Sequence, residues 1–151
     1  LEKVVFLPCW TGMFGFSEPV ASLPDHYRGE HCDSISWLAR DCSKPGRTGV
    51  EMICAQAGAH WSRDNLDMNK GDVLEVVKGG LEKMAGQPLQ PVYAEVHRWL
   101  YALVDKPFGK AYLGCSEQRI FAIGDGMLRG RVEAAFESAS RLCDHLEHAV
   151  M

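Results

Sequence analysis

The sequence predicts an α+β fold in which an antiparallel or mixed sheet is accompanied by helices. Short β-branched and aromatic segments, separated by turn residues, occupy residues 1–57. The spacing of apolar residues then changes to a helical period over residues 72–84, and a second helical period closes the chain. Further strand-like segments lie between these two helical periods, and the sequence has no internal repeat.

The first part of the chain is expected to form three strands. Lys3–Phe6 is short and β-branched, and the proline two residues later is expected to close it. Residues 11–33 are rich in glycine and proline, which indicates a long irregular connection. Two apolar segments, Ile35–Ala39 and Glu51–Ala57, flank a turn at residues 43–47 that contains a Pro-Gly pair. We therefore expect these two segments to pair as a hairpin.

The segment from Asp72 to Gly86 has the pattern of an amphipathic helix. Asp72 is the expected N-cap, and Gly86 is expected to end the helix. Gly79 and Gly80 lie inside it, and each lowers helix propensity by about 1 kcal/mol relative to alanine. One face carries the apolar residues Val73, Val76, Val77, Leu81 and Met84.

The rest of the chain is expected to contain three strands and a helix. Pro91–Leu103 is rich in Val, Tyr and Trp and is typical of a strand. Ala111–Leu113 and Ile120–Ile123 are short enough to form a hairpin. The closing helix begins near Arg131 and runs for about four turns. Its broad apolar stripe comprises Val132, Ala135, Phe136, Ala139, Leu142, Cys143 and Leu146.

Composition and charge exclude several classes of partner. The 151 residues carry a net charge of −4 and no basic cluster, so we expect neither a nucleic-acid nor a membrane partner. No apolar run approaches the roughly 18–20 residues that span a bilayer, and no signal peptide is visible. The chain begins at Leu1 without an initiator methionine, which favours a fragment or a processed product.

The six cysteines are scattered, and no CxxC pair occurs. Zinc sites and dithiol redox motifs favour such close pairs, so no metal site is expected. We interpret the cysteines as free, mostly buried thiols of a protein in the reducing cytoplasm.

The segment Phe121–Gly126 leads from a predicted strand into a glycine-rich loop before the last helix. Glycines in such a loop let the backbone approach a phosphate, and the following helix N-terminus offers free N–H groups. Only 21 residues follow Gly130, too few for a self-contained dinucleotide-binding βαβ unit. Two interpretations remain. Asp125 accepts hydrogen bonds from hydroxyls while the amides of residues 132–134 hold an anionic oxygen, or the glycines only form a tight turn capped by Asp125.

Five stretches, in order along the chain, resemble the flavin-containing amine oxidases. The segment Ile123–Asp125 followed by Gly130–Ala139 resembles their C-terminal FAD-binding signature, and more specifically that of the bacterial renalase-like branch. The other stretches are Pro8–Trp10, Ser36–Arg47, His60–Ser62 and Val96–Ala102.

This resemblance implies a two-domain flavoprotein. Residues 1–92 would be part of a substrate domain, and residues 93–151 would return to the FAD-binding domain as its last strand, loop and helix. Asp125 would contact the ribityl or pyrophosphate part of FAD, and the start of the last helix would face the flavin. The implied cofactor-binding residues are Gly124, Asp125, Arg131, Val132, Glu133, Ala134 and Ala135. The implied substrate-binding residues are His97, Arg98 and Trp99.

The activity implied by the resemblance is FAD-dependent oxidation. An isomeric dihydronicotinamide or an amine-type donor would transfer a hydride to the flavin, and oxygen would reoxidise it. The GxGxxG half of the FAD site is absent from this sequence, and Ser138-Ala139 replaces the usual Ser-Gly pair. The activity is therefore expected of a parent protein, whereas this chain alone is expected to be inactive and without FAD. The alternative is a non-catalytic module that self-associates or binds a partner supplying the missing half.

Overall fold

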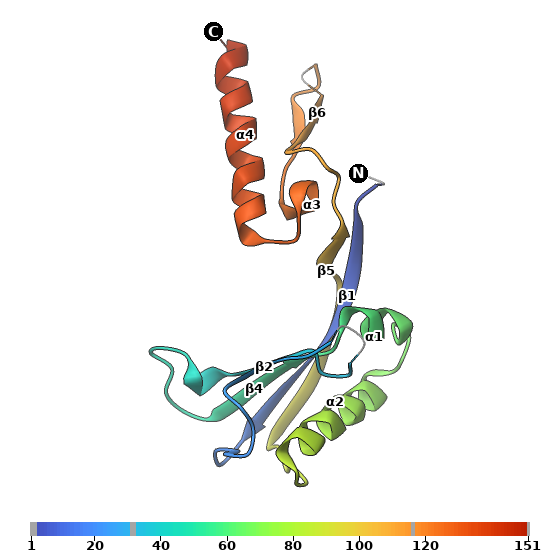
Figure 1. Ribbon diagram of the computed structural model, residues 1–151, viewed down its shortest axis with the longest axis vertical. Helices are drawn as coiled ribbons and strands as arrows, with labels where there is room; N and C mark the ends of the chain where they lie inside the picture. The colour runs from blue at the N-terminus through green and yellow to red at the C-terminus, as the bar shows by residue number, and fades with distance from the viewer. Residues whose placement is uncertain (1–2, 31–32, 116, 151) are drawn as a thin grey trace. The chain divides into compact units, whose positions relative to one another are not determined.

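The computed structural model describes residues 3–30, 33–115 and 117–150, and it divides into two compact units (Figure 1). The sheet unit comprises Pro8–Leu100, and the hairpin–helix unit comprises Leu1–Leu7 with Tyr101–Met151. Two long strands, β1 (Val5–Phe16) and β5 (Tyr93–Lys106), contribute to both units. The domain boundary expected after residue 92 stays a prediction.

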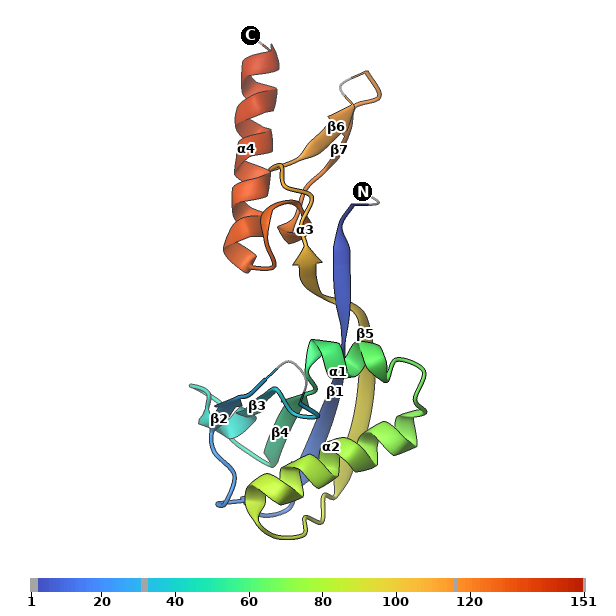
Figure 2. The same ribbon diagram turned by 45° about the vertical axis from the view of Figure 1, so that its right-hand side comes forward.

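The sheet unit has the α+β architecture that the sequence predicts. Its five strands are ordered β2-β3-β4-β1-β5, and the registers defined for β1–β4, β2–β3 and β3–β4 are antiparallel. Two helices, α1 (Ala59–Asp64) and α2 (Lys70–Ala85), cover one face of the sheet (Figure 2). The remaining strands are β2 (His26–Arg28), β3 (Trp37–Arg40) and β4 (Glu51–Gln56), and a short 3-10 helix, η1, covers Asp41–Ser43.

The prediction of an irregular connection over residues 11–33 was wrong for residues 11–16 and 26–28, because β1 continues to Phe16 and β2 lies inside this segment. Pro8 does not end β1, since β4 pairs with β1 only from Thr11 onward and Pro8 therefore breaks no hydrogen bond to β4. A glycine in this strand marks close packing. A Cβ atom on Gly12 would lie 2.6 Å from the ring of Phe14 and 3.0 Å from Val77. By contrast, the predicted β3–β4 hairpin is confirmed.

The core of the sheet unit lies between the sheet and the two helices. Side chains alternate between the two faces of a strand, so every second residue points toward the helices. The core includes Trp10, Phe14, Leu38, Ile53, Ala55, Val73, Val77, Leu81 and Val96, each no more than 3% exposed. Residues at the intervening positions of β1, β4 and β5 lie on the opposite, uncovered face.

Helix α2 begins earlier than expected. Asn69 is the N-cap, and its side chain accepts a hydrogen bond from the amide of Asp72 at 2.9 Å. Asp72 is therefore the third helical residue, where a carboxylate favourably meets the positive end of the helix dipole. The predicted end is confirmed, because Gly86 adopts the left-handed conformation with φ of 69°. Helix α1, which the sequence analysis missed, has only six residues.

A buried ion pair joins strands β3 and β4. The Nε atom of Arg40 lies 2.9 Å from Oε1 of Glu51, and the two side chains are 13% and 3% exposed. Arg40 also donates to the carbonyls of Val20 and Leu23, at 2.6 and 2.8 Å. The thiol of Cys42 donates to the other oxygen of Glu51 at 2.9 Å. The pair thereby fixes the connection between β1 and β2 against the middle of the sheet.

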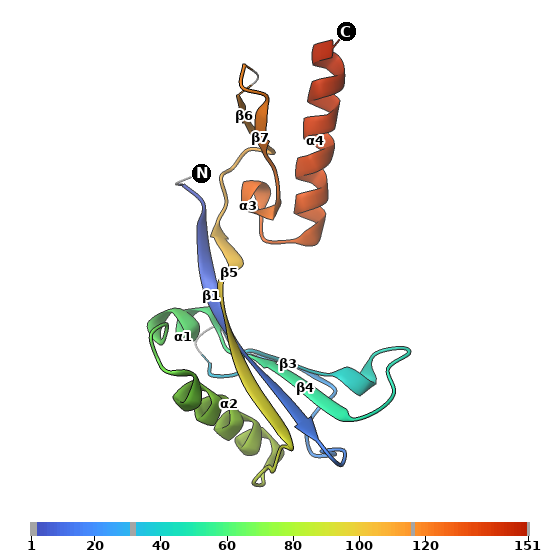
Figure 3. The same cartoon turned by 180° about the vertical axis from the view of Figure 1, so that it is seen from behind.

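The hairpin–helix unit contains the predicted hairpin and the long final helix (Figure 3). Strands β6 (Leu113–Cys115) and β7 (Ile120–Ala122) pair antiparallel, and α3 (Asp125–Leu128) precedes α4 (Val132–Val150). Among the described helices, none has both the length and the apolar character needed to cross a membrane.

Much of the apolar stripe of α4 is exposed. Val132, Phe136 and Leu146 are 86%, 74% and 38% exposed, whereas Ala134, Ser138 and Leu142 face the rest of the unit. The stripe is thus wider than the surface that the hairpin and α3 cover. In the described part of this unit, the fully or nearly buried side chains are those of Met127, Ala134, Ser138 and Leu142.

The five cysteines in the described residues are free, whereas Cys32 lies outside them. The expectation that most cysteines are buried was wrong. Only Cys9 of the five is buried, and Cys54 is half-buried. Cys42 lies in η1, and Cys115 and Cys143 lie on β6 and on the uncovered side of α4, so these three are exposed.

The two glycines inside α2 are expected to respond oppositely to alanine. A Cβ on Gly79 meets nothing within 4 Å, so Gly79→Ala should raise the free energy of unfolding by about 0.5–1 kcal/mol. A Cβ on Gly80 would lie 2.8 Å from Cδ1 of Ile35, so Gly80→Ala should lower it by about 1 kcal/mol or more through overpacking. Urea denaturation of the two variants measures the difference. Equal effects would contradict the packing of α2 on Ile35.

The reactivity of Cys42 is expected to depend on Glu51. The hydrogen bond to Glu51 raises the pKa of the Cys42 thiol, which lowers the thiolate fraction at any pH below that pKa. Iodoacetamide should therefore modify Cys42 more slowly than the exposed Cys143 at about pH 8, and the difference should narrow as the pH is raised. Peptide mass spectrometry at each pH measures both rates. Faster modification of Cys42 at about pH 8 would exclude this hydrogen bond.

Candidate functional site

The glycine-rich loop after β7 is held in place by Ser138. The amide of Gly124 donates to Oγ of Ser138 at 3.0 Å, and Oγ donates to the carbonyl of Ala111 at 2.5 Å. Ser138 is 0% exposed, so one buried hydroxyl connects the loop, α4 and the segment before β6. Ser138 is not among the functional residues predicted from the sequence. A polar residue on the buried side of a predicted helix was the available signal.

Gly124 has a backbone conformation that favours glycine. Its φ is 137°, and a Cβ atom there would have nothing within 4 Å. A ligand can therefore approach the backbone at this position without meeting a side chain. Asp125 follows, half-buried, and its Oδ1 accepts a hydrogen bond from the amide of Gly126 at 2.8 Å.

The sequence predicted that the final helix follows the loop directly. In the structure, a short helix lies between them. Asp125 begins α3, and the amide of Arg129 donates to the Asp125 carbonyl at 3.0 Å. This extra helical turn separates the Gly-Asp pair from the start of α4. The turn forms because residues 125–128 make local hydrogen bonds that a purely extended loop would leave open.

The sequence predicted that the backbone amides of residues 132–134 hold an anionic oxygen. Only some of these amides are available to a ligand. The amides of Ala134 and Ala135 both donate to the carbonyl of Arg131, at 3.0 and 3.3 Å. The amides of Val132 and Glu133, the first two helical residues, have no acceptor within the helix. The side chain of Ala134 is buried, whereas those of Arg131, Val132 and Glu133 are exposed and that of Ala135 is half-buried. An anion would therefore meet two backbone donors at the positive end of the helix.

The expected substrate residues lie on strand β5 of the sheet unit. His97 and Trp99 are exposed on the uncovered face, and their ring centroids are 4.3 Å apart. Arg98 points to the other face, donates to the carbonyl of Leu66 at 2.6 Å, and lies 5.6 Å from the ring centroid of Trp10. The structure thus brings His97 and Trp99 together and separates Arg98 from both.

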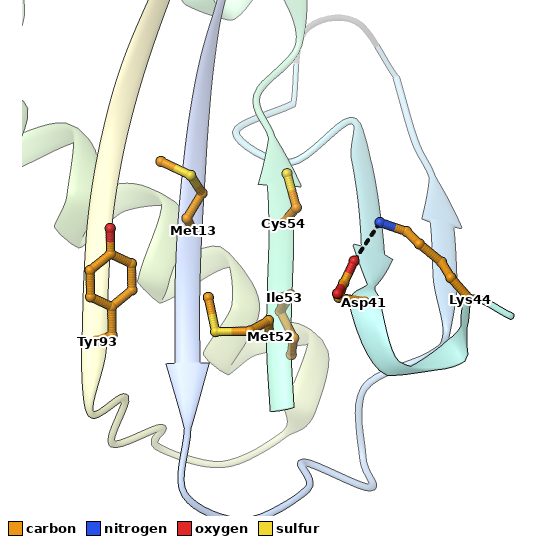
Figure 4. Close-up of a pocket in the computed structure, with 7 residues that line it drawn as sticks. All are labelled: Met13, Asp41, Lys44, Met52, Ile53, Cys54 and Tyr93. Carbon is orange, nitrogen blue, oxygen red and sulfur yellow. Dashed lines mark hydrogen bonds and ion pairs between the residues drawn. The ribbon is translucent and has the colours of Figure 1, made fainter. Parts of the chain in front are cut away.

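A hollow on the uncovered face of the sheet was missed by the sequence analysis (Figure 4). It has a volume of about 440 Å³ and is lined by Met13, Asp41, Lys44, Met52, Ile53, Cys54 and Tyr93. The signal in the sequence was the alternation along the strands, which puts Met13, Met52 and Tyr93 opposite the core. Without the pairing of the strands, that alternation does not say which residues are neighbours.

Charged groups surround one end of this hollow. Lys44 Nζ lies 2.8 Å from Oδ1 of Asp41, and Arg47 approaches the other oxygen of Asp41 at 3.8 Å. The hydrogen bond from Lys44 lowers the pKa of Asp41, so its carboxylate is charged at neutral pH. On β5, the hydroxyl of Tyr93 donates to Glu95 at 2.5 Å, and this hydrogen bond raises the pKa of Tyr93.

Comparison with known proteins identifies a structural likeness. No protein-family model matches the sequence. The fold is similar to the crystal structure of a "putative protoporphyrinogen oxidase" from Exiguobacterium sp. 255-15, with a TM-score of 0.57 and 14% sequence identity. The alignment covers 68% of this chain and 24% of that protein, so the match involves about a quarter of its length. At this identity the likeness shows that the fold is shared.

Replacement of Ser138 is expected to loosen the glycine-rich loop. Ser138→Ala leaves a part-buried amide and a part-buried carbonyl without this partner, which should cost about 1 kcal/mol. Hydrogen–deuterium exchange should accelerate in peptides that contain Gly124. Ser140→Ala, in the same helix but less buried, is the matched control and should leave exchange in this loop unchanged. Equal exchange in both variants would contradict the role of the Ser138 hydroxyl.

Proposed function

We propose that this chain is part of an FAD-dependent oxidoreductase, to which it contributes a substrate-side sheet and the last helix of the FAD-binding domain. The observation that carries this proposal is the loop at Gly124, where open backbone at positive φ is followed, after the single turn of α3, by the start of α4 with two amides that have no acceptor within the helix. The shared fold with a protein described as an oxidase adds support.

The residues of the loop and helix fit one part of FAD. Gly124 would let the cofactor approach the backbone, and the free oxygen of the Asp125 carboxylate would accept a hydrogen bond from a ribityl hydroxyl. The amides of Val132 and Glu133 would stabilise negative charge at the edge of the isoalloxazine ring. When bound, FAD would accept a hydride from the substrate and be reoxidised by oxygen.

The uncovered face of the sheet supplies candidate contacts for the substrate. We propose an isomeric dihydronicotinamide or an amine-type donor, of the kind implied by the renalase-like resemblance. The paired rings of His97 and Trp99 favour a flat, aromatic substrate. Arg98 is already bound to Leu66 and packed on Trp10, so its proposed role is to hold this part of β5 in position.

Additional polypeptide would complete the FAD site. This sequence contains no GxGxxG loop for the ADP part of FAD. The exposed Val132 and Phe136 of α4 support docking of such a segment, because apolar side chains of this size are usually covered. We place the complete protein in the cytoplasm, in keeping with the free cysteines among the described residues, and propose neither a nucleic-acid nor a membrane partner.

A second candidate function is a non-catalytic module that acts by association. The same exposed face of α4 and the small number of buried side chains around it favour this alternative. Copies of the chain would then associate through α4 in the absence of any cofactor. Flavin that stays with the protein through gel filtration would exclude a cofactor-free module.

Titration of the purified chain with FMN, followed by amide NMR, tests the flavin site. Chemical shifts of Gly124, Asp125, Val132 and Glu133 should move, because these residues meet the ribityl and isoalloxazine parts. ADP should leave them unchanged, since the chain has no site for that half of FAD. Asp125→Ala should weaken the FMN response about tenfold.

Asp64→Ala, an exposed substitution in the sheet unit, is the control for the loss of a surface carboxylate and should leave the FMN response unchanged. Shifts confined to other residues, or an equal response to ADP and FMN, would contradict the proposed flavin site.

A further inference from the structure

The hollow on the uncovered face of the sheet has the properties of a small-molecule site. Strands β4, β1 and β5 are neighbours in the sheet, and Met52, Met13 and Tyr93 project from them on the same face (Figure 4). Met13 lies opposite Cys54, two residues along β1 from the pair of Gly15 and Met52. The volume of about 440 Å³ lies within the range of about 300–1,000 Å³ that is typical of ligand pockets.

A glycine makes this depression possible. Gly15 on β1 pairs with Met52 on β4, and a Cβ atom at Gly15 would lie 3.0 Å from the Met52 sulfur and 3.3 Å from Cβ of Tyr93. A side chain at this position would therefore fill the space between Met52 and Tyr93. The thioether of Met52 is flexible and adapts to the shape of a bound group.

The lining favours a flat, apolar group. Met13, Met52 and the Cys54 thiol are polarizable, and the ring of Tyr93 is 46% exposed. Burial raises the pKa of Cys54, so this thiol is neutral at physiological pH and adds no charge to the hollow. An aromatic or conjugated ring that lies across these side chains would replace water on a largely apolar surface.

The charges at the two ends differ in sign. Lys44, which lines the hollow, and Arg47 both contact the carboxylate of Asp41, so two cations share one carboxylate at this end. Their side chains are 49% and 63% exposed; Lys44 lines the hollow, and Arg47 lies next to it through its contact with Asp41. At the other end Glu95 accepts from Tyr93 and contributes a negative charge. An acidic ligand would therefore place its anionic group toward Lys44.

We propose that this hollow binds a small, planar and mainly apolar anion, with its ring on Met13, Met52 and Tyr93 and its acidic group at Lys44 and Arg47. The site lies entirely within the sheet unit and uses none of the residues assigned to FAD. Its binding can therefore be measured without flavin, and failure of either proposal leaves the other intact.

Two fluorescent probes test the ring and the charge separately. Anilinonaphthalene sulfonate has a planar apolar body and an anionic group, and N-phenyl-1-naphthylamine has the same body without the charge. Wild-type protein should bind the anionic probe more tightly. Met52→Asp should weaken both probes about tenfold or more, because it introduces a charge beneath the ring. The double variant Lys44→Gln/Arg47→Gln should weaken only the anionic probe, by about three- to tenfold.

The exposed apolar face of α4 is the competing site for such probes. Phe136→Asp removes its largest side chain and should leave the affinity of both probes unchanged, within about twofold. Loss of probe binding in Phe136→Asp with full binding in Met52→Asp would overturn the proposal. So would an equal effect of the Lys44/Arg47 double variant on both probes.

Methionine oxidation in wild-type protein keeps the test independent of variant folding. The anionic probe should protect Met13 and Met52 from hydrogen peroxide, as measured by peptide mass spectrometry. Met68 and Met84, which pack against the core from other elements, are the internal controls and should oxidise at unchanged rates. Equal oxidation of Met13 and Met52 with and without probe would overturn the proposal.

Discussion

The alternation of side chains across the five-stranded sheet is the constraint on which the rest of the sheet unit depends. One set of positions on β1 and β4 points to α1 and α2 and forms the core, as Phe14 and Ile53 do. The intervening set, with Met13 and Met52, is left on the open face. A shift of one residue in the pairing would exchange these sets, bury the hollow and expose the core. The stability of the unit and the position of its candidate ligand site therefore have the same cause.

The buried pair of Arg40 and Glu51 lies at the border of these two regions. Arg40 fixes the connection between β1 and β2 through backbone carbonyls, and Glu51 holds both Arg40 and Cys42. Arg40 is paired in this way with Glu51, and Asp25 approaches the Arg40 side chain at 3.8 Å. Lys44 and Arg47, by contrast, share the carboxylate of Asp41 near the hollow. A buried pair of this kind is costly to break, because loss of either partner leaves a charge without compensation.

The hairpin–helix unit is organised differently, since few of its described side chains are buried. The hydroxyl of Ser138 holds this unit together by hydrogen bonds that join the glycine-rich loop and the segment before β6 to α4. The apolar residues Val132, Phe136 and Leu146 on the outer side of α4 remain exposed, and the proposed docking of further polypeptide rests on this exposure. The proposed flavin contacts are mostly backbone groups, so their geometry depends on this single hydroxyl and on Gly124.

The sequence alone determined the α+β class, the hairpin of β3 and β4, the end of α2 at Gly86 and the long final helix, because each rests on local periodicity or turn chemistry. It did not reveal that Gly12 lies within a strand, because a glycine that makes room for Phe14 and Val77 has the same local signature as a loop. The separation of Arg98 from His97 and Trp99, and the assembly of the hollow from three strands, were decided only by the tertiary structure. Both depend on which strands are neighbours, and contacts between residues distant in sequence leave no local signal.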